Sequence, residues 1–156
     1  MTADLERMAR GTGGTLEPVA PSRMVRMAMR PMTRVLNPLI LKLAGRPRFR
    51  MAAQLQHVGR RSGRTYTTPV SARLSGDMVL IALTFGNQSD WSRNVLAAGG
   101  CSIRIEGKDY SLTQPQYLTR QEAMPLVAAA FSPFERAGFR VLGIRQILCL
   151  RLVHEQ

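Results

Sequence analysis

Six consecutive residues, Gly59 to Arg64 in the order Gly-Arg-Arg-Ser-Gly-Arg, are the part of the sequence best suited to bind an anion. Arginine presents a rigid, permanently charged fork of N–H donors, and glycine lets the backbone turn tightly and approach a ligand. Successive backbone N–H groups in such a turn form a concavity for anions. The segment therefore predicts a phosphate or polycarboxylate site, although a solvated β-turn explains the same residues equally well. The Gly-x-x-x-x-Gly-Lys-Ser/Thr pattern of a P-loop is absent.

The second informative segment is Trp91-Ser92-Arg93-Asn94, which begins 27 residues after Arg64. Asn94 falls on the same face of an expected helix as Trp91, and asparagine is unfavourable inside a helix unless its amide has a partner. An amide beside an aromatic wall suits a planar heterocycle with carbonyl and N–H edges. Thr84-Phe85-Gly86 ends an expected strand, where its backbone groups are placed to meet the same ring. Taken alone, Trp91 is more simply explained as a core residue.

The sequence offers little for catalysis by protein groups. His57 and His154 are the only histidines and belong to no Cys/His cluster, so we expect no metal site and interpret both as surface or hydrogen-bonded histidines. No Gly-x-Ser-x-Gly motif is present. The few acids form no evident catalytic pair. If the chain is an enzyme, its chemistry comes from a cofactor, and no catalytic side chain is assigned.

The charge balance indicates an anionic partner. The 156 residues include 22 basic and 10 acidic side chains, for a net charge of +12. Such an excess fits a phosphorylated or polycarboxylate cofactor, an anionic membrane or nucleic acid. We expect no nucleic acid, because no recognised nucleic-acid motif occurs and aromatic residues do not interleave with the basic stretch. Two cysteines, the absence of a membrane-spanning apolar run and an N-terminus without a secretory core predict a cytoplasmic protein.

Three divisions of the chain are expected. Residues 1–20 are predicted to be a flexible tail, residues 21–50 a basic amphipathic helical segment, and residues 51–156 the folded cofactor-binding domain. The segment 21–50 contains basic residues and no acid. It either covers the core with a solvated outer face or lies on an anionic membrane surface at the inner face of the cell membrane.

An antiparallel β-domain with inserted helices is predicted for the remainder, mainly β within the α+β class. The strands are expected over residues 51–58, 65–74, 78–85, 101–105, 110–117 and 146–153. One short helix is predicted over 90–98, after Ser89 and before Gly99. The capping box from Thr119 to Glu122 predicts a second helix that continues to about Phe131. Short strands with covering helices indicate a small barrel.

Together these segments resemble the deazaflavin-dependent nitroreductase family, the split β-barrel oxidoreductases of actinobacteria that use coenzyme F420. The resemblance rests on the Gly-Arg-Arg-Ser-Gly-Arg turn, the Thr-Thr-Pro-Val strand, the Gly-Asp hairpin and the Trp-Ser-Arg-Asn helix, from about Leu55 to Glu106. It implies a split β-barrel of the FMN-binding type with an N-terminal helix. It also implies an F420H2-dependent reductase that transfers a hydride to a hydrophobic quinone-like or nitroaromatic acceptor. FMN is a less favoured cofactor.

The resemblance assigns cofactor-binding roles to eleven residues. Arg60, Arg61 and Ser62 would hold the phosphate of the cofactor, with Arg64 or the basic N-terminal segment near its polyglutamate tail. The deazaflavin ring would be lined by Pro69, Thr84, Phe85 and Gly86. Trp91 would pack near the ring, and Asn94 would help to fix the cofactor. The full set is Arg60, Arg61, Ser62, Gly63, Arg64, Pro69, Thr84, Phe85, Gly86, Trp91 and Asn94.

The sequence also departs from the family. Well-known members carry several tyrosines in the C-terminal third, whereas no tyrosine follows Tyr117 here, and Phe85 stands where a lysine is common. These changes leave a second function open, a non-catalytic, membrane-associated protein that binds a fatty acid or other lipid. The resemblance allows either a monomer or a homodimer.

Overall fold

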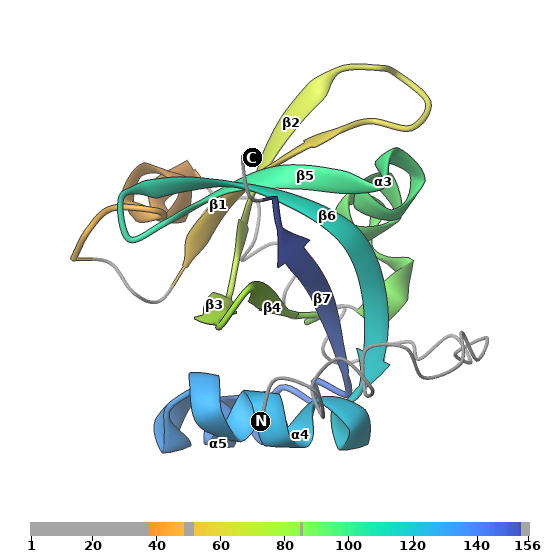
Figure 1. Ribbon diagram of the computed structural model, residues 1–156. Helices are drawn as coiled ribbons and strands as arrows, with labels where there is room; N and C mark the ends of the chain where they lie inside the picture. Colours follow the sequence, from red (N-terminus) through yellow and green to blue (C-terminus); the bar gives the residue numbers. More distant parts are fainter. Residues whose placement is uncertain (1–37, 49–51, 85, 154–156) are drawn as a thin grey trace.

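The computed structural model describes residues 38–48, 52–84 and 86–153, and seven strands of that part form one antiparallel sheet. The strand order is β2-β1-β5-β6-β7-β4-β3, and the sheet curls into a half-barrel (Figure 1). The strands are β1 (Ala53–Val58), β2 (Thr65–Val70), β3 (Ala72–Ser75), β4 (Met78–Ala82), β5 (Gly100–Ile105), β6 (Lys108–Thr119) and β7 (Gln146–Leu152). This confirms the mainly β, antiparallel split-barrel fold class with inserted helices.

The curl of the sheet follows from its connectivity. β2 and β3 lie at opposite ends of the strand order, yet only Ser71 separates them along the chain. One residue spans less than about 4 Å, so the two edges of the sheet must meet where this residue passes between them. The Ser71 carbonyl accepts a hydrogen bond from the Ala82 N–H at 3.0 Å, which attaches the crossing to the end of β4.

Two hydrophobic clusters lie on the two faces of the sheet. Val79 and Ile81 of β4 join the cluster inside the curl, whereas Leu80, between them, joins the cluster under the helices. Because side chains alternate along a strand, a strand that is covered on both faces is apolar at every position. β4 is buried throughout and β7 over its first five residues, which agrees with the buried final strand predicted from the sequence.

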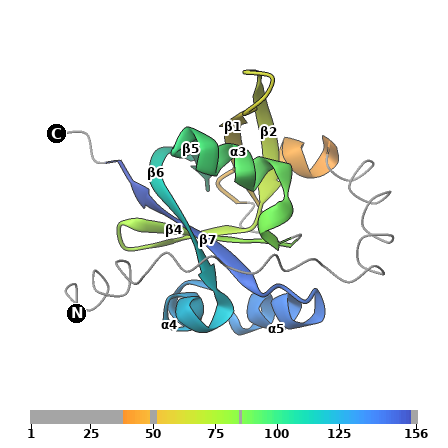
Figure 2. The same ribbon diagram turned by 90° about the vertical axis from the view of Figure 1, so that its right-hand side faces the viewer.

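Three helices cover the sheet. α4 (Arg120–Ala130) and α5 (Pro133–Val141) lie side by side on one side of the sheet, and α3 (Asp90–Ala98) packs against β1, β5 and β6 (Figures 1 and 2). A single turn of 3-10 helix, η1 (Gly86–Gln88), precedes α3. α3 ends at Gly99, whose φ of 73° is the left-handed conformation that glycine adopts readily.

Local signals predicted two of these helices correctly. α3 has the predicted bounds, and α4 begins with the predicted capping box, in which the Thr119 side chain and the Glu122 carboxylate each bond to the other residue's backbone N–H. α5 was not predicted. Its signal is a second capping box, from Ser132 to Glu135, with a proline at the start of the helix.

Two predicted strands were wrong in extent. Residues 65–74 form two strands rather than one, because β2 pairs with β1 and β3 pairs with β4. Residues 78–85 form a strand only as far as Ala82, after which the Leu83 N–H bonds to the Gln146 carbonyl at 3.2 Å and the chain enters η1. In both places the strand ends where its partner strand ends.

The predicted tail, 1–20, and most of the basic segment, 21–50, lie outside the described residues. Within the described part of that segment, residues 38–43 are helical. Residues that follow this helix are joined to the sheet, since the Gly45 N–H donates to the Ala52 carbonyl at 3.0 Å and the Gly107 N–H donates to the Gly45 carbonyl. In the part of the chain described, no helix is long and apolar enough to cross a membrane.

Candidate functional site

The predicted anion-binding turn, residues 59–64, is a closed loop between β1 and β2. The Gly59 N–H donates to the Arg64 carbonyl at 2.8 Å, and the Gly63 N–H donates to the Gly59 carbonyl at 2.9 Å. A Cβ atom at Gly59 would lie 2.4 Å from Ser62 Oγ and 2.8 Å from Tyr66 Cε2, so a side chain does not fit there without a shift. The turn is therefore built tightly around a position that requires glycine.

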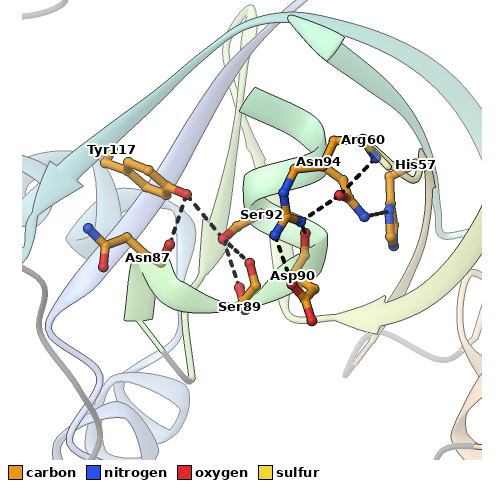
Figure 3. A network of polar contacts seen from close by, with 8 residues as sticks. All are labelled: His57, Arg60, Asn87, Ser89, Asp90, Ser92, Asn94 and Tyr117. Atoms are coloured by element: carbon orange, nitrogen blue, oxygen red, sulfur yellow. Dashed lines mark hydrogen bonds and ion pairs between the residues drawn. The ribbon is translucent and has the colours of Figure 1, made fainter. Parts of the chain in front are cut away.

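Asn94 of α3 fixes the start of this turn. Its Oδ1 accepts a hydrogen bond from the Arg60 backbone N–H at 3.1 Å and another from Arg60 Nη1 at 2.8 Å (Figure 3). The Asn94 side chain is buried, with 6% of the residue exposed. Arg60 also contacts Asp90 through its guanidinium, at 3.3 Å to the carbonyl and 3.1 Å to the carboxylate. The first turn of α3 and the anion-binding turn are thus held together by Arg60.

His57 completes this polar cluster from β1. Its Nδ1 lies 3.2 Å from Asn94 Nδ2, and its Nε2 lies 3.1 Å from Thr68 Oγ1 (Figure 3 shows the Asn94 contact). The Tyr66 ring stacks on the imidazole with centroids 5.7 Å apart. Burial lowers the pKa of His57 below its ordinary value of 6.5. The sequence-based interpretation of His57 as a hydrogen-bonded histidine agrees with these contacts, but it missed that the ring lies beside the site.

Several donors of the turn are left for a ligand. Within the described residues, the guanidinium groups of Arg61 and Arg64 contact no acid and no acceptor, and both side chains are exposed. The backbone N–H groups of Arg61 and Ser62 also have no partner within the same ranges, whereas the Arg64 N–H is bonded to Ser62 Oγ at 3.3 Å. Two free cationic side chains and two free N–H groups on one turn are suited to an anion.

A cavity of about 580 Å³ lies between the turn, β2 and the start of α3. This volume falls within the range of small-molecule sites. The half-buried Trp91 supplies an aromatic wall, and the turn supplies cationic groups. The lining residues are His57, Gly59, Arg60, Arg61, Ser62, Tyr66, Thr67, Thr68, Asp90, Trp91 and Asn94.

The cavity brings together only part of the predicted set. Arg60, Arg61, Ser62, Trp91 and Asn94 line it. Gly63 and Arg64 belong to the same turn but do not line the cavity, and neither do Pro69, Thr84 or Gly86; Phe85 lies outside the described residues.

Gly59 was predicted as part of the turn, and sequence reasoning missed five other lining residues, four of them on β1 and β2. Side chains alternate between the two faces of a strand, so every second residue of β1 and β2 counted from the Gly-Arg-Arg-Ser-Gly turn lies on one face. This pattern is the signal that indicates His57, Tyr66 and Thr68. The β1–β2 register places His57 opposite Tyr66 and Leu55 opposite Thr68, next to the turn. A ligand bound at the turn therefore meets residues from both strands.

A second polar cluster lies on the other side of α3. Ser92 is completely buried, and its Oγ lies 2.7 Å from Ser89 Oγ and 3.1 Å from the Tyr117 hydroxyl (Figure 3). Burial raises the pKa of Tyr117 above its ordinary value. The Asn87 backbone N–H donates to Gln146 Oε1 at 2.9 Å, which ties η1 to β7. This cluster fixes α3 from its far side, so the helix holds Trp91 and Asn94 in place.

Comparison with known proteins identifies the family. A family model described as F420H(2)-dependent quinone reductase matches residues 34–127, which include the turn, the cavity and α3. No curated protein matches the chain.

Solved structures with a similar fold share little sequence. One, described as an F420-H2 dependent reductase (FDR-A), is 17% identical, with 65% of this chain and 95% of its own chain covered and a TM-score of 0.49. A domain-swapped dimer is 16% identical, with 81% and 98% covered and a TM-score of 0.50. Atu2129 from Agrobacterium tumefaciens str. C58, of unknown function, is 17% identical, with 93% and 60% covered and a TM-score of 0.49.

The family model spans more than half of the chain, and the site just described lies inside the matched residues. This chain therefore belongs to the F420H2-dependent quinone reductase family, and its cofactor is F420.

Proposed function

We propose that this chain transfers a hydride from reduced F420 to a hydrophobic quinone-like or nitroaromatic acceptor, in the cavity beside the anion-binding turn. The observation that carries the proposal is the junction of Arg60 with Asn94, which holds a turn with free cationic donors next to the aromatic wall at Trp91. The family supplies the cofactor and the reductase activity. The acceptor and the residues that bind each group are part of the proposal.

The residues present fit the chemical parts of F420. A phosphate requires charge-assisted N–H donors, which Arg61, Arg64 and the free backbone N–H groups of the turn provide. A planar ring requires a flat apolar wall, and Trp91 together with the stacked Tyr66 and His57 rings lines the cavity. A tail of carboxylates is attracted by a chain with a net charge of +12.

In this mechanism the residues of the chain bind the cofactor and orient the reacting groups. Reduced F420, when bound, supplies the hydride. Arg61 and Arg64 would hold the phosphate, and Arg60 would set the position of the turn through Asn94 rather than contact the ligand with all of its donors. Trp91 would exclude water from one side of the cavity, and holding the reacting groups together in a fixed orientation is a large source of rate acceleration. Polar side chains of the cavity, such as Thr68, would meet the edge of the ring.

The predicted roles of Gly63, Pro69, Thr84, Phe85 and Gly86 stay predictions. Gly63 shapes the turn by its φ of 67°. Pro69 lies on β2 and Thr84 follows β4, and neither lines the 580 Å³ cavity. We propose that Pro69 and Thr84 contact the cofactor only if its ring extends past the cavity toward η1. In that case Thr84→Val should leave the phosphate contacts unchanged and weaken the affinity for the cofactor only modestly.

The assembly and the N-terminal segment are further parts of the proposal. The domain-swapped dimer among the similar structures supports a homodimer for this chain, and a monomer is the alternative. Light scattering coupled to size exclusion separates the two. The division into residues 1–20, 21–50 and 51–156, and the contact of residues 21–50 with an anionic membrane surface, stay predictions that vesicle flotation of the full chain tests.

Fluorescence titration with oxidised F420 tests the proposed function. Trp91 is the only tryptophan, so its quenching reports binding at the cavity. We expect saturable binding of F420 and weaker binding of FMN. The double variant Arg60→Ala with Arg61→Ala should weaken F420 binding by at least about tenfold, ~1.4 kcal/mol. Lys108→Ala, at the first residue of β6 and away from the turn, is the control for loss of a positive charge.

The same titration with a long-chain fatty acid addresses the other function left open by the sequence. Binding of the fatty acid without binding of F420 would assign the cavity to lipid and overturn the proposal. Binding of F420 with unchanged affinity in the double variant would keep the cofactor but remove the phosphate from the turn. Where F420 binds, a screen of quinones and nitroaromatic compounds for consumption of the reduced cofactor identifies the acceptor.

A further inference from the structure

We propose that His57 is a positioning residue whose own protonation controls the anion-binding turn. In its neutral form His57 holds Asn94 in the orientation in which its amide oxygen accepts both hydrogen bonds from Arg60, a pair of contacts that we call the clamp. When the imidazole gains a second proton this orientation is lost, and the turn loosens its hold on an anion. The inference rests on the proposed function in one respect only, that the anion is the phosphate of the cofactor.

The orientation of the Asn94 amide is decided by Arg60. Two groups of Arg60, the backbone N–H and Nη1, face one end of this amide at 3.1 and 2.8 Å, and neither group can accept a hydrogen bond. The amide oxygen must therefore point toward Arg60. Its NH2 group then points toward His57, where Nδ1 lies 3.2 Å away.

This orientation decides the protonation of His57. An amide NH2 is only a donor, so the Nδ1 atom that faces it must carry a lone pair. The proton of the neutral imidazole is then on Nε2, from which it is donated to Thr68 Oγ1 at 3.1 Å. Both ring nitrogens of His57 therefore form a hydrogen bond, Nδ1 as the acceptor and Nε2 as the donor.

A protonated His57 is incompatible with the same cluster. Its Nδ1–H would face the Asn94 NH2, donor against donor. A flip of the amide would satisfy His57 but would turn the NH2 group toward the two donors of Arg60. Because Asn94 has a single amide oxygen, it can serve either Arg60 or a protonated His57, and not both. Protonation of His57 therefore competes directly with the clamp on Arg60.

The surroundings of His57 offer the charged form little support. The residue is 6% exposed. The Tyr66 ring of β2 stacks on the imidazole, and Arg60 of the turn, paired with Asp90 of α3, reaches it through Asn94. On β5, Cys101 lies one position beyond the paired residues Gln56 and Ser102. Burial raises the pKa of the Cys101 thiol to about 12, so it is neutral. Within the described residues, no carboxylate is hydrogen-bonded to the imidazole.

The first test needs no cofactor. Nitrogen-15 spectra of the full chain report the tautomer of His57, and the Arg60 backbone amide reports the clamp. We expect a neutral Nε2–H tautomer at about pH 7.5, and an Arg60 amide signal that shifts with the His57 titration below its ordinary value of 6.5. An Nδ1–H tautomer at neutral pH, or an Arg60 amide that ignores the titration of His57, overturns the proposal.

The second test is the affinity for oxidised F420 as a function of pH in three proteins. In the wild type, affinity should fall by about three- to tenfold as the pH drops from about 7.5 through the titration of His57 that the spectra locate, the value of one net hydrogen bond. His57→Asn places an amide oxygen near the position of Nδ1 and does not titrate. The ratio of its affinities at neutral and acid pH should therefore stay close to one, whatever the loss of the imidazole ring from the cavity wall does to its affinity at neutral pH. His57→Phe keeps the stacking with Tyr66 but offers Asn94 no acceptor, so it should bind weakly at every pH.

The outcomes separate this inference from the proposed function. If His57→Asn loses affinity in acid as the wild type does, His57 does not control the turn, and F420 binding at neutral pH still supports the proposed function. If no protein binds F420 at any pH, the proposed function fails, and the spectra alone decide whether His57 sets the clamp. If His57→Phe does not fold, the comparison of wild type with His57→Asn remains sufficient.

Discussion

Oδ1 of Asn94 accepts two hydrogen bonds from one residue, Arg60, through both its backbone N–H and its guanidinium. The two residues are 34 positions apart in the sequence, so this contact joins the β1–β2 turn to α3, and both residues line the cavity. Buried polar groups that satisfy one another fix a single arrangement more firmly than apolar contacts do. The position of the turn is therefore set by a residue that sequence reasoning assigned to the cofactor.

Asn94→Asp should invert the pH response of the cluster. The carboxylate keeps an oxygen for Arg60 and presents the other to His57, where it favours a proton on Nδ1. The pKa of His57 should rise relative to the wild type, in which burial lowers it. NMR titration of the imidazole measures the change directly.

The titration of His57 should change the free energy of unfolding with pH in opposite directions in the wild type and in Asn94→Asp. In the wild type the folded pKa of His57 lies below the unfolded value, so its contribution to stability is lost as pH falls below 6.5. In Asn94→Asp, a pKa above the unfolded value would give a contribution that is complete below 6.5 and lost as pH rises through the folded pKa. Urea unfolding across this pH range tests the crossover, and parallel curves for the two proteins would contradict it.

Arg60 and Arg61 should differ in what their removal costs. Arg61 is exposed and has no partner within the described residues, so Arg61→Ala should change stability by less than about 0.5 kcal/mol while weakening F420 binding. Arg60→Ala removes a hydrogen bond to buried Asn94 and the ion pair with Asp90, so it should cost about 1–2 kcal/mol of stability as well. Chemical denaturation and F420 titration of both variants separate the two effects. Equal stability losses would show that Arg60 is no clamp.

Gly59→Ala and Gly138→Ala should shift stability in opposite directions. A Cβ at Gly59 would meet Ser62 Oγ and the Tyr66 ring, so the substitution should cost about 1–3 kcal/mol and disturb the turn. A Cβ at Gly138 in α5 meets nothing within 4 Å, so alanine there should stabilise by about 0.5–1 kcal/mol through helix propensity. Thermal unfolding ranks both variants against the wild type. A neutral Gly59→Ala would mean that the turn adapts without cost.

The two cysteine thiols should be unreactive in the folded protein. Burial raises the pKa of Cys101 to about 12 and that of Cys149 to about 11, so almost no thiolate is present at about pH 8. We expect iodoacetamide to modify neither thiol in the native chain within minutes, and both after unfolding in guanidinium chloride. Mass spectrometry counts the adducts. Rapid native labelling of Cys101 would show that β5 opens readily.

Ser132→Ala should weaken α5, the helix that was not predicted. The Ser132 hydroxyl accepts the Glu135 backbone N–H at 3.3 Å, and the Glu135 carboxylate accepts the Ser132 N–H at 2.8 Å. Loss of this N-cap should cost about 1 kcal/mol. Glu135 also forms an ion pair with Arg73 of β3, so the variant should loosen the attachment of α5 to the sheet. Ser111→Ala, at an exposed position of β6, is the matched control for removal of a hydroxyl.

Features written within a few residues were predictable from the sequence. The capping box of α4, the glycine that ends α3 and the presence of a turn at Gly-Arg-Arg-Ser-Gly are each signalled by neighbouring residues, although Asn94 fixes where that turn lies. The buried final strand was predictable because it is apolar at nearly every position, as a strand covered on both faces must be. The capping box of α5 carries the same kind of signal and was overlooked.

Tertiary structure alone decided where strands end and which polar groups meet. β2 and β3 separate at Ser71 because their partners lie at opposite edges of a curled sheet, and nothing in the local sequence records those partners. The contact between His57 and Asn94 likewise joins residues 37 positions apart. Local propensity cannot encode such pairs, because they form only when the barrel curls and α3 packs against β1. The sequence by itself determined the donors of the proposed anion site, and the fold decided which of them remain free for a ligand.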